Sequence, residues 1–269
     1  MRGGNASVHA IVRRTTGLCI FGRAAPQSFG HKLMRLVPVL GVVAALGLVG
    51  VVAYRALLGG QTVSWHQRLT VIVETPAGER RGSSVTEVTN TEWHGPLVPP
   101  EAGGIVPVYR GEAVVVEVLP GRYMFALLKG TKPDGDAPFW VYAAYDLEGP
   151  SDLAEKTYVK KMAKVKRQPL DTPVPLPPIA YPILVTFDDI TRPETVRAVD
   201  PANLAAEFGS GVNLTGITLE VTDAPVTEGP VEAVLGWFYS PEYWTNPGWA
   251  NLPVFVKDVI SGIKSPIKR

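Results

Sequence analysis

Two adjacent carboxylates, Asp188 and Asp189, directly follow an apolar run at residues 183–187. Carboxylates in such a position can bind a metal or act as a general acid and a general base. Catalysis also needs a second carboxylate or a histidine close in space, and neighbouring residues of a strand point to opposite faces. The pair therefore favours an Asx-turn at a strand end. The alternative is a hydrolase of a carbohydrate or peptide polymer, with carboxylates about 5 to 9.5 Å apart in a groove lined by tryptophans.

Two histidines, His66 and His94, each follow a tryptophan directly. Together with Glu92 or Glu101 they would make a three-ligand zinc site if strands brought them together. No H-x-x-x-H spacing supports such a site. Ordinary strand or loop histidines are therefore the favoured interpretation.

Two loops carry weaker signals for ligand binding. The segment Lys132–Asp136 has two carboxylates at calcium-loop spacing, but it lacks the third ligand and the terminal glutamate, so a turn is favoured. The segment Gly209–Gly211 has the glycines of a phosphate loop, yet no Lys-Ser/Thr pair follows it. We therefore expect no cofactor, no metal and no catalytic residue.

The strongest candidates for binding are two clusters of side chains. The aromatic cluster lies within WFYSPEYWTNPGW and consists of Trp237, Phe238, Tyr239, Tyr243, Trp244 and Trp249. Dense aromatics can stack on sugars, sit at a bilayer interface or contact a protein, although some must also cap the core. The basic ridge consists of Lys156, Lys160, Lys164 and Arg167 at helical spacing. It either faces anionic lipid or an acidic envelope polymer, or is a solvated helix face, which is the favoured interpretation.

A hydrophobic segment near the start dominates the chain. Residues Leu36 to Tyr54 form 19 positions without a charge, and Ala56 to Leu58 extend the run past Arg55. About 20 apolar residues cross a hydrocarbon core roughly 30 Å thick. The segment therefore predicts a transmembrane helix over 36–58. A buried core helix and a cleaved signal peptide are the alternatives, and no clear A-x-A cleavage site follows the run.

Charge is distributed unevenly along the chain. Six of the 26 Lys and Arg residues lie in residues 1–35, which contain no Asp or Glu. Apart from these six and Arg55, 19 basic residues remain, and they share the rest of the chain with all 25 acidic residues. A basic tail stays in the cytoplasm, so we expect the C-terminal domain outside it. An acidic body does not favour nucleic acid. Met34 offers a second start site, and a transit peptide is an alternative for the tail. The single cysteine, Cys19, precedes the hydrophobic segment and lies in a poor lipidation context.

The remaining chain predicts an α+β domain over 61–262 that is mainly β with a few short helices. The predicted strands are 69–74, 83–89, 114–119, 122–128, 183–187 and 217–221, with a turn at Thr75–Gly78. The hairpin at 114–128 is apolar on both faces and is expected at the centre. The predicted helices are 151–167 and a short one from Asp200 through Phe208, closed by Gly209. The proline-rich segment 168–182 is expected to be extended, as a linker between two domains or as a surface strap.

Two segments, FDDITRPETVRAVDPANLAAEFGSGVNLTGITLEVTD and GEAVVVEVLPGRYMFALLKG, resemble uncharacterised bacterial proteins that begin with one hydrophobic helix. The resemblance covers about two thirds of the chain. It implies a bacterial envelope location, and it brings no activity, cofactor or catalytic residue with it. The hydrophobic segment and the basic tail before it predict the inner membrane, with the C-terminal domain in the periplasm. No nucleophile elbow, phosphate loop or dinucleotide fingerprint is present. We therefore expect a non-enzymatic anchored protein that binds a protein or cell-wall partner.

Overall fold

The computed structural model describes residues 42–54, 60–93, 97–99, 104–132, 135–147, 163–241, 245 and 252–264. Contacts divide the chain into two compact units, Met1–Val52 and Ala53–Arg269. The second unit has α+β structure and is mainly β, as predicted. Residues 42–54 form a helix. Among the helices described, none is both long and apolar enough to cross a membrane, and the rest of the segment 36–58 lies outside the described residues.

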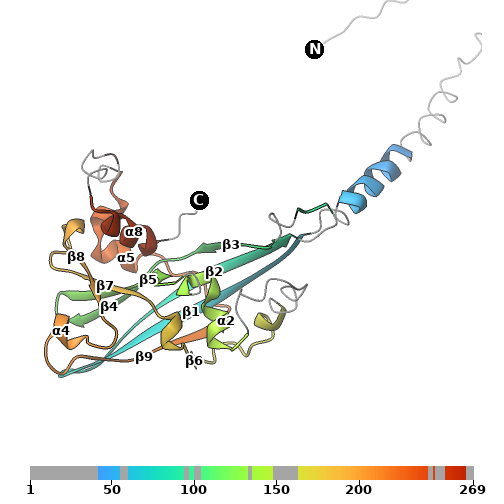
Figure 1. Ribbon diagram of the computed structural model, residues 1–269. Coiled ribbons are helices and arrows are strands. Elements are labelled where there is room, and N and C mark those ends of the chain that lie inside the picture. Colours follow the sequence, from blue (N-terminus) through green and yellow to red (C-terminus); the bar gives the residue numbers. More distant parts are fainter. Residues whose placement is uncertain are drawn as a thin grey trace, which may run out of the picture. The chain divides into compact units, whose positions relative to one another are not determined.

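The domain is built on two antiparallel sheets (Figure 1). The first sheet, in spatial order, consists of β3 (Gly104–Arg110), β2 (Gly78–Trp93), β1 (Gly60–Thr75), β9 (Asn213–Thr222) and β6 (Val174–Pro175). The second sheet, in spatial order, consists of β4 (Val114–Leu119), β5 (Arg122–Gly130), β7 (Pro182–Phe187) and β8 (Val196–Val199). All six strands predicted from the sequence lie within these elements.

The longest element is the hairpin of β1 and β2, whose strands have 16 residues each. Its turn is the predicted one: the Thr75 hydroxyl donates to the Gly78 carbonyl oxygen at 2.7 Å, and Gly78 has a φ of 103°. Glycine adopts such positive φ values without steric cost. Both strands run well beyond the predicted segments, because pairing in the long hairpin includes residues of low β propensity such as Gly60, Glu79 and Asn90.

The β4–β5 hairpin lies between two hydrophobic cores, as its apolar character on both faces predicts. Met124, Ala126 and Leu128 of β5 belong to the first core, which also contains inward side chains of β1, β2 and β9. Phe125 and Leu127 point the other way, into a second core with the C-terminal helices. A strand that is buried on both faces has no room for polar side chains, which explains its continuous apolar run.

Short helices cover the two cores. The first core is closed in part by η3 (Ala137–Phe139) and α2 (Trp140–Ala144). The second is closed by α5 (Pro230–Val234), η7 (Gly236–Tyr239) and α8 (Val254–Ile263), and Figure 1 shows α5 and α8 together beside the second sheet. The connections contain η5 (Pro178–Ala180), η6 (Pro193–Thr195) and α4 (Ala205–Phe208).

One predicted helix is described only at its end, and the other begins later in the chain than predicted. Most of 151–167 lies outside the described residues, and residues 163–165 are helical with Val165 fully buried. The helix predicted from Asp200 begins only at Ala205, because the Asp200 carboxylate accepts the Ala202 backbone N–H at 2.9 Å and forms a separate turn. Its end at Gly209, with a φ of 98°, is as predicted.

The proline-rich segment 168–182 runs along the first sheet, inside the compact unit Ala53–Arg269. Leu170 bridges to Val221, and β6 pairs with β9 as the edge strand of the first sheet. Leu176 and Ala180 are buried in the first core. Proline is tolerated here because an edge strand can leave N–H positions unpaired.

Candidate functional site

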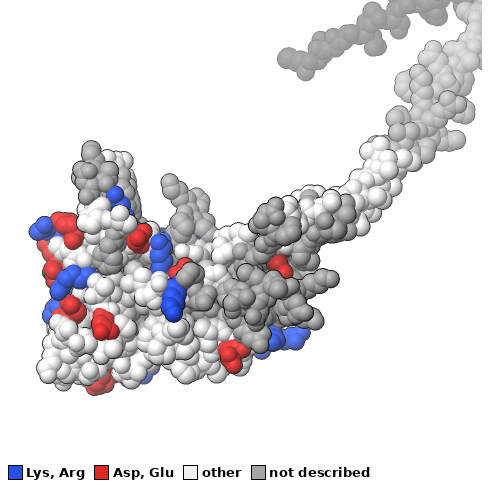
Figure 2. Space-filling view, in the orientation of Figure 1, with Lys and Arg blue, Asp and Glu red and all other residues white. Residues whose placement is uncertain are grey.

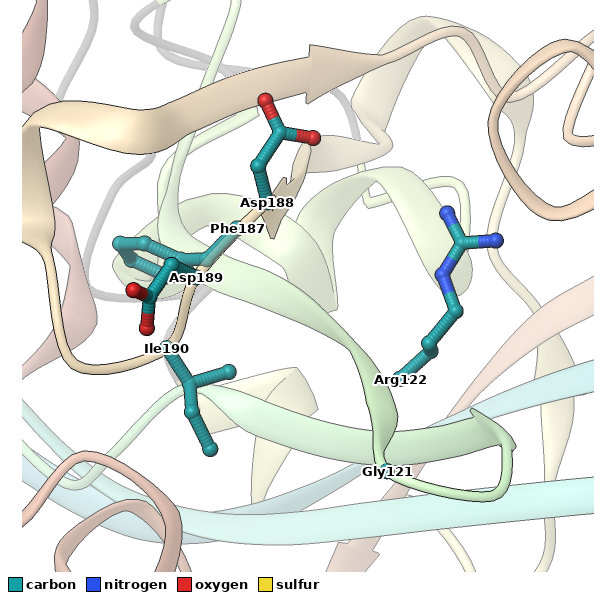
Figure 3. Close-up of a pocket in the computed structure, with 6 residues that line it drawn as sticks. All are labelled: Gly121, Arg122, Phe187, Asp188, Asp189 and Ile190. Carbon is teal, nitrogen blue, oxygen red and sulfur yellow. The ribbon is translucent and has the colours of Figure 1, made fainter.

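The candidate carboxylates Asp188 and Asp189 border an open depression of about 570 Å³ (Figure 3). It lies where the β4–β5 turn meets the end of β7, and its lining consists of Gly121, Arg122, Phe187, Asp188, Asp189 and Ile190. In Figure 3 the side chains of Asp188 and Asp189, which follow the end of β7, point in opposite directions. The Arg122 guanidinium lies across the depression from them.

Asp189 forms the Asx-turn that the sequence favours. Its Oδ1 accepts the backbone N–H of Thr191 at 2.9 Å and the Thr191 hydroxyl at 2.7 Å. These bonds stabilise the charged form, so the pKa of Asp189 is lowered from its ordinary value. A general acid needs the opposite shift, because it must hold a proton at neutral pH.

The other two charged residues of the depression, Asp188 and Arg122, are engaged with residues outside its lining. Asp188 accepts a hydrogen bond from Arg197 at 2.5 Å, and Arg197 also pairs with Glu207 at 3.0 Å. Arg122 donates to the Glu207 carbonyl oxygen at 2.5 Å and lies 5.3 Å above the Phe208 ring centre. The charged side chains around the depression therefore hold the end of β7 against β8 and α4.

The proposed zinc ligands are not brought together where the structure describes them. The register of β1 and β2 places His66 on the outer face of the first sheet and Glu92 on the inner face. His66 Nδ1 lies 2.6 Å from the Ala224 carbonyl oxygen. His94 and Glu101 lie outside the described residues. Within the described part of the chain no group of three His, Cys, Asp or Glu side chains is placed to hold a metal ion.

The two loops with weak ligand signals act as turns. Asp136 Oδ1 accepts the Gly130 backbone N–H at 2.9 Å, and burial raises the pKa of this carboxyl. The Gly135 N–H donates to the Lys132 carbonyl oxygen at 2.9 Å, which closes the loop. Asp134 lies outside the described residues. The segment Gly209–Gly211 is an exposed turn with positive φ at both glycines.

Half of the aromatic cluster packs onto the second core. Phe238 is buried, and the half-buried Trp237 donates from Nε1 to the Ile190 carbonyl oxygen at 2.7 Å. Trp237 also meets Phe187 edge-on, with ring centres 6.2 Å apart. Tyr239 is half-buried beside these rings. Tyr243, Trp244 and Trp249 lie outside the described residues.

The basic ridge is described only in part. Lys164 and Arg167 are exposed, and Lys156 and Lys160 lie outside the described residues. The Lys164 carbonyl oxygen accepts the Gln168 side-chain amide at 3.1 Å, which joins the ridge to the strap. An exposed lysine fits both the solvated face and the binding surface that the sequence predicts.

A buried glutamate that sequence analysis missed organises the C-terminal helices. Glu112 is 1% exposed and accepts backbone N–H groups of Gly229 at 3.1 Å and Val231 at 3.3 Å, at the start of α5. The Tyr239 hydroxyl donates to it at 2.6 Å, and Lys264 Nζ lies 3.4 Å away. The pKa of the Tyr239 hydroxyl is raised, mainly by burial and to a smaller extent by the Glu112 carboxylate. A lone glutamate before an apolar strand carries no sequence signal for such a cluster, because its partners are more than 100 residues away.

Exposed apolar side chains are the other prominent feature. In the helix at residues 42–54 the large side chains are 54–67% exposed. In the domain, Trp93, Leu97, Val106 and Val108 are 40–61% exposed. In Figure 2 many of the charged side chains lie over α4, β8, α5 and α8.

Comparisons with known proteins add no assignment. No family model, no curated protein and no solved structure matches the chain. The resemblance of residues 111–130 and 187–223 to bacterial membrane-anchored proteins therefore stays a prediction from the sequence.

Proposed function

We propose that this chain is a single-pass protein of the bacterial inner membrane, whose periplasmic domain binds a protein or a cell-wall component. The observation that carries the anchor is the helix at residues 42–54, where large apolar side chains are more than half exposed. Water disfavours a helix that is apolar on every face. The charge-free run from Leu36 to Tyr54 has the length that a hydrocarbon core of roughly 30 Å requires.

A charge introduced into the helix tests the anchor. The double variant Leu46→Arg/Val49→Arg should move the full-length chain from the membrane pellet to the supernatant after alkaline carbonate extraction. Each arginine at a bilayer centre costs about 2.5–3.5 kcal/mol on an insertion scale. Val254→Arg is the matched control, because Val254 is 73% exposed in the domain, and it should stay in the pellet. Wild-type protein that extracts freely would refute the anchor.

Orientation follows from the basic residues before the helix, which remain in the cytoplasm. External protease on spheroplasts should digest the domain and leave the N-terminal segment protected. Mass spectrometry of the protected peptide also reports whether the chain starts at Met1 or at Met34. Protection of the whole chain would reverse the proposed orientation.

Partner binding is supported by the aromatic residues after Tyr239 and by the exposed end of the basic ridge. A photo-crosslinking amino acid at position 244 or 249 should form adducts in intact cells. The same group at position 179, where Ile179 is 66% exposed on the strap, is the control. For an anionic cell-wall polymer, Lys156→Glu/Lys160→Glu/Lys164→Glu should abolish co-sedimentation that added salt also weakens. Failure of both tests would contradict partner binding.

A hydrolase is the second candidate, and its support is that Asp188 and Asp189 border one depression. Against it stand the Asx-turn of Asp189 and the ion pair of Asp188 with Arg197. Loss of activity on cell-wall polymer in Asp188→Asn/Asp189→Asn, with folding retained, would favour hydrolysis. Equal activity of the wild type and the double variant would rule out the hydrolase.

A further inference from the structure

Exposed apolar side chains concentrate at one end of the first sheet. Of seven large apolar side chains exposed in the described part of the domain, four lie between Trp93 and Val108. The register pairs Trp93 with Gly104, Thr91 with Val106 and Thr89 with Val108. Directly paired residues project from the same face, so Trp93, Val106 and Val108 share the outer face of the sheet. Leu97, 61% exposed, follows Trp93 by four residues.

On the described strands, the outward positions at this end carry no charged side chain. Its outward positions on the three strands are Thr62, Ser64, Thr89, Thr91, Trp93, Val106 and Val108. The first row with charged side chains contains Glu87 and Arg110, which lie beside His66. The hydroxyls satisfy each other, with Thr62 and Thr91 oxygens 3.0 Å apart and those of Ser64 and Thr89 2.8 Å apart. Hydroxyls that are already hydrogen-bonded lower the cost of leaving water.

The same end is tied to the apolar helix by a short connection. Only residues 55–59 separate the helix end at residue 54 from Gly60, where β1 begins. Five residues span at most about 18 Å when extended. Gly60 pairs with Trp93, and Trp93 with Gly104, so this connection enters at the apolar end. The opposite end, at Thr75–Gly78, lies a full strand away, roughly 50 Å at 3.3 Å per residue.

We infer that the end of the first sheet formed by Gly60, Trp93 and Gly104 rests in the lipid headgroup region, with Trp93, Leu97 and Val106 against the bilayer. This inference rests on the proposed membrane anchor and specifies how the domain meets the membrane. Tryptophan is enriched at membrane interfaces because its ring is apolar and its N–H is polar. The neighbouring outward residues Thr62, Ser64, Thr89 and Thr91 are uncharged and also suit the headgroup region.

An extended partner strand added to β3 is the rival occupant, since β3 is the edge of the first sheet. Pro107 stands in the middle of β3 and has no N–H to donate. Proline on an edge strand is a known obstacle to strand addition. The lipid surface requires no backbone hydrogen bonds and is not affected by this proline.

Environment-sensitive labels on the full-length chain test the inference. Cys19→Ser removes the single native thiol, and Leu97→Cys or Val106→Cys then carries a nitrobenzoxadiazole probe. The control is Ala77→Cys, in the exposed turn between β1 and β2 at the opposite end of the first sheet. In vesicles of phosphatidylethanolamine and phosphatidylglycerol, headgroup-labelled quencher lipids should quench probes at 97 and 106 several-fold more than at 77.

Each outcome separates the inference from the anchor. Protein that floats with the vesicles but shows equal quenching at 77 and 106 overturns the inference and leaves the anchor intact. Protein that does not float refutes the anchor itself. A blue-shifted probe at 106 that lipid quenchers do not reach means that protein covers this face, and it also overturns the inference.

Discussion

Glu112 Oε1 lies 2.6 Å from the hydroxyl oxygen of Tyr239, across 127 residues of chain. Glu112 sits in the connection between β3 and β4, and Tyr239 ends η7, so this bond ties the sheets to the C-terminal helices. The carboxylate is also held by backbone N–H groups at the start of α5 and by Lys264. A buried carboxylate is tolerated only when such donors replace water.

Removal of the Tyr239 hydroxyl should lower stability. In Tyr239→Phe, we expect the free energy of unfolding to fall by about 1.5–3 kcal/mol, the range for hydrogen bonds to charged groups. Urea denaturation measures the change. Tyr123→Phe is the control, because Tyr123 packs against the same core outside this cluster. Equal losses in the two variants would contradict the assigned role.

Alkaline pH should destabilise the domain through buried tyrosines. Burial raises the pKa of Tyr142 to about 12, against a smaller lowering by its hydrogen bond with Asn90. Because the folded pKa is raised, the unfolded chain loses its proton first, and stability falls from about pH 10 through pH 12. The loss attributable to Tyr142 is about 2–3 kcal/mol, from the two-unit difference. The free energy of unfolding, measured with urea at several pH values between 8 and 12, should fall less steeply with pH in Tyr142→Phe than in the wild type. The same pH dependence in both proteins would contradict the assignment.

The contact between the two sheets should not tolerate a methyl group at Gly82. A Cβ there would lie 2.1 Å from the Val115 carbonyl oxygen. We expect Gly82→Ala to destabilise the domain by about 1–3 kcal/mol, as overpacking does. Gly216→Ala, with nothing within 4 Å of its added Cβ, is the control and should change stability far less. Thermal unfolding that shifts equally in both would show that β2 and β4 are not in close contact.

The Asx-turn at Asp189 makes a prediction that separates structure from catalysis. Asp189→Asn keeps an oxygen to accept the Thr191 N–H, whereas Asp189→Ala does not. The alanine variant should therefore show the lower melting temperature of the two. In an NMR titration of the wild type, the pKa of Asp189 should lie below its ordinary value, because Thr191 stabilises the charged form. A raised pKa would instead support a general acid.

Local patterns were enough for much of the sheet structure. The alternation in β9, the doubly apolar β4–β5 hairpin and the turn at Thr75–Gly78 depend on side-chain period and glycine geometry. These are short-range properties that a sequence displays directly. The Asx-turn at Asp189 belongs to the same class, because its partner Thr191 is two residues away.

Only the tertiary structure showed which segments far apart in the sequence lie side by side. The sequence showed an extended proline-rich segment, and only the fold placed β6 beside β9 as an edge strand. The residues Trp237 to Tyr239 read as a surface or a core cap, and the fold packed them against Phe187 and Glu112. The sequence by itself determined the apolar segment at 36–58, its basic flank and the strand pattern, because these depend on neighbours along the chain. Which carboxylates are buried, paired or left at a surface was decided by the chain path, which brings together residues more than 100 positions apart.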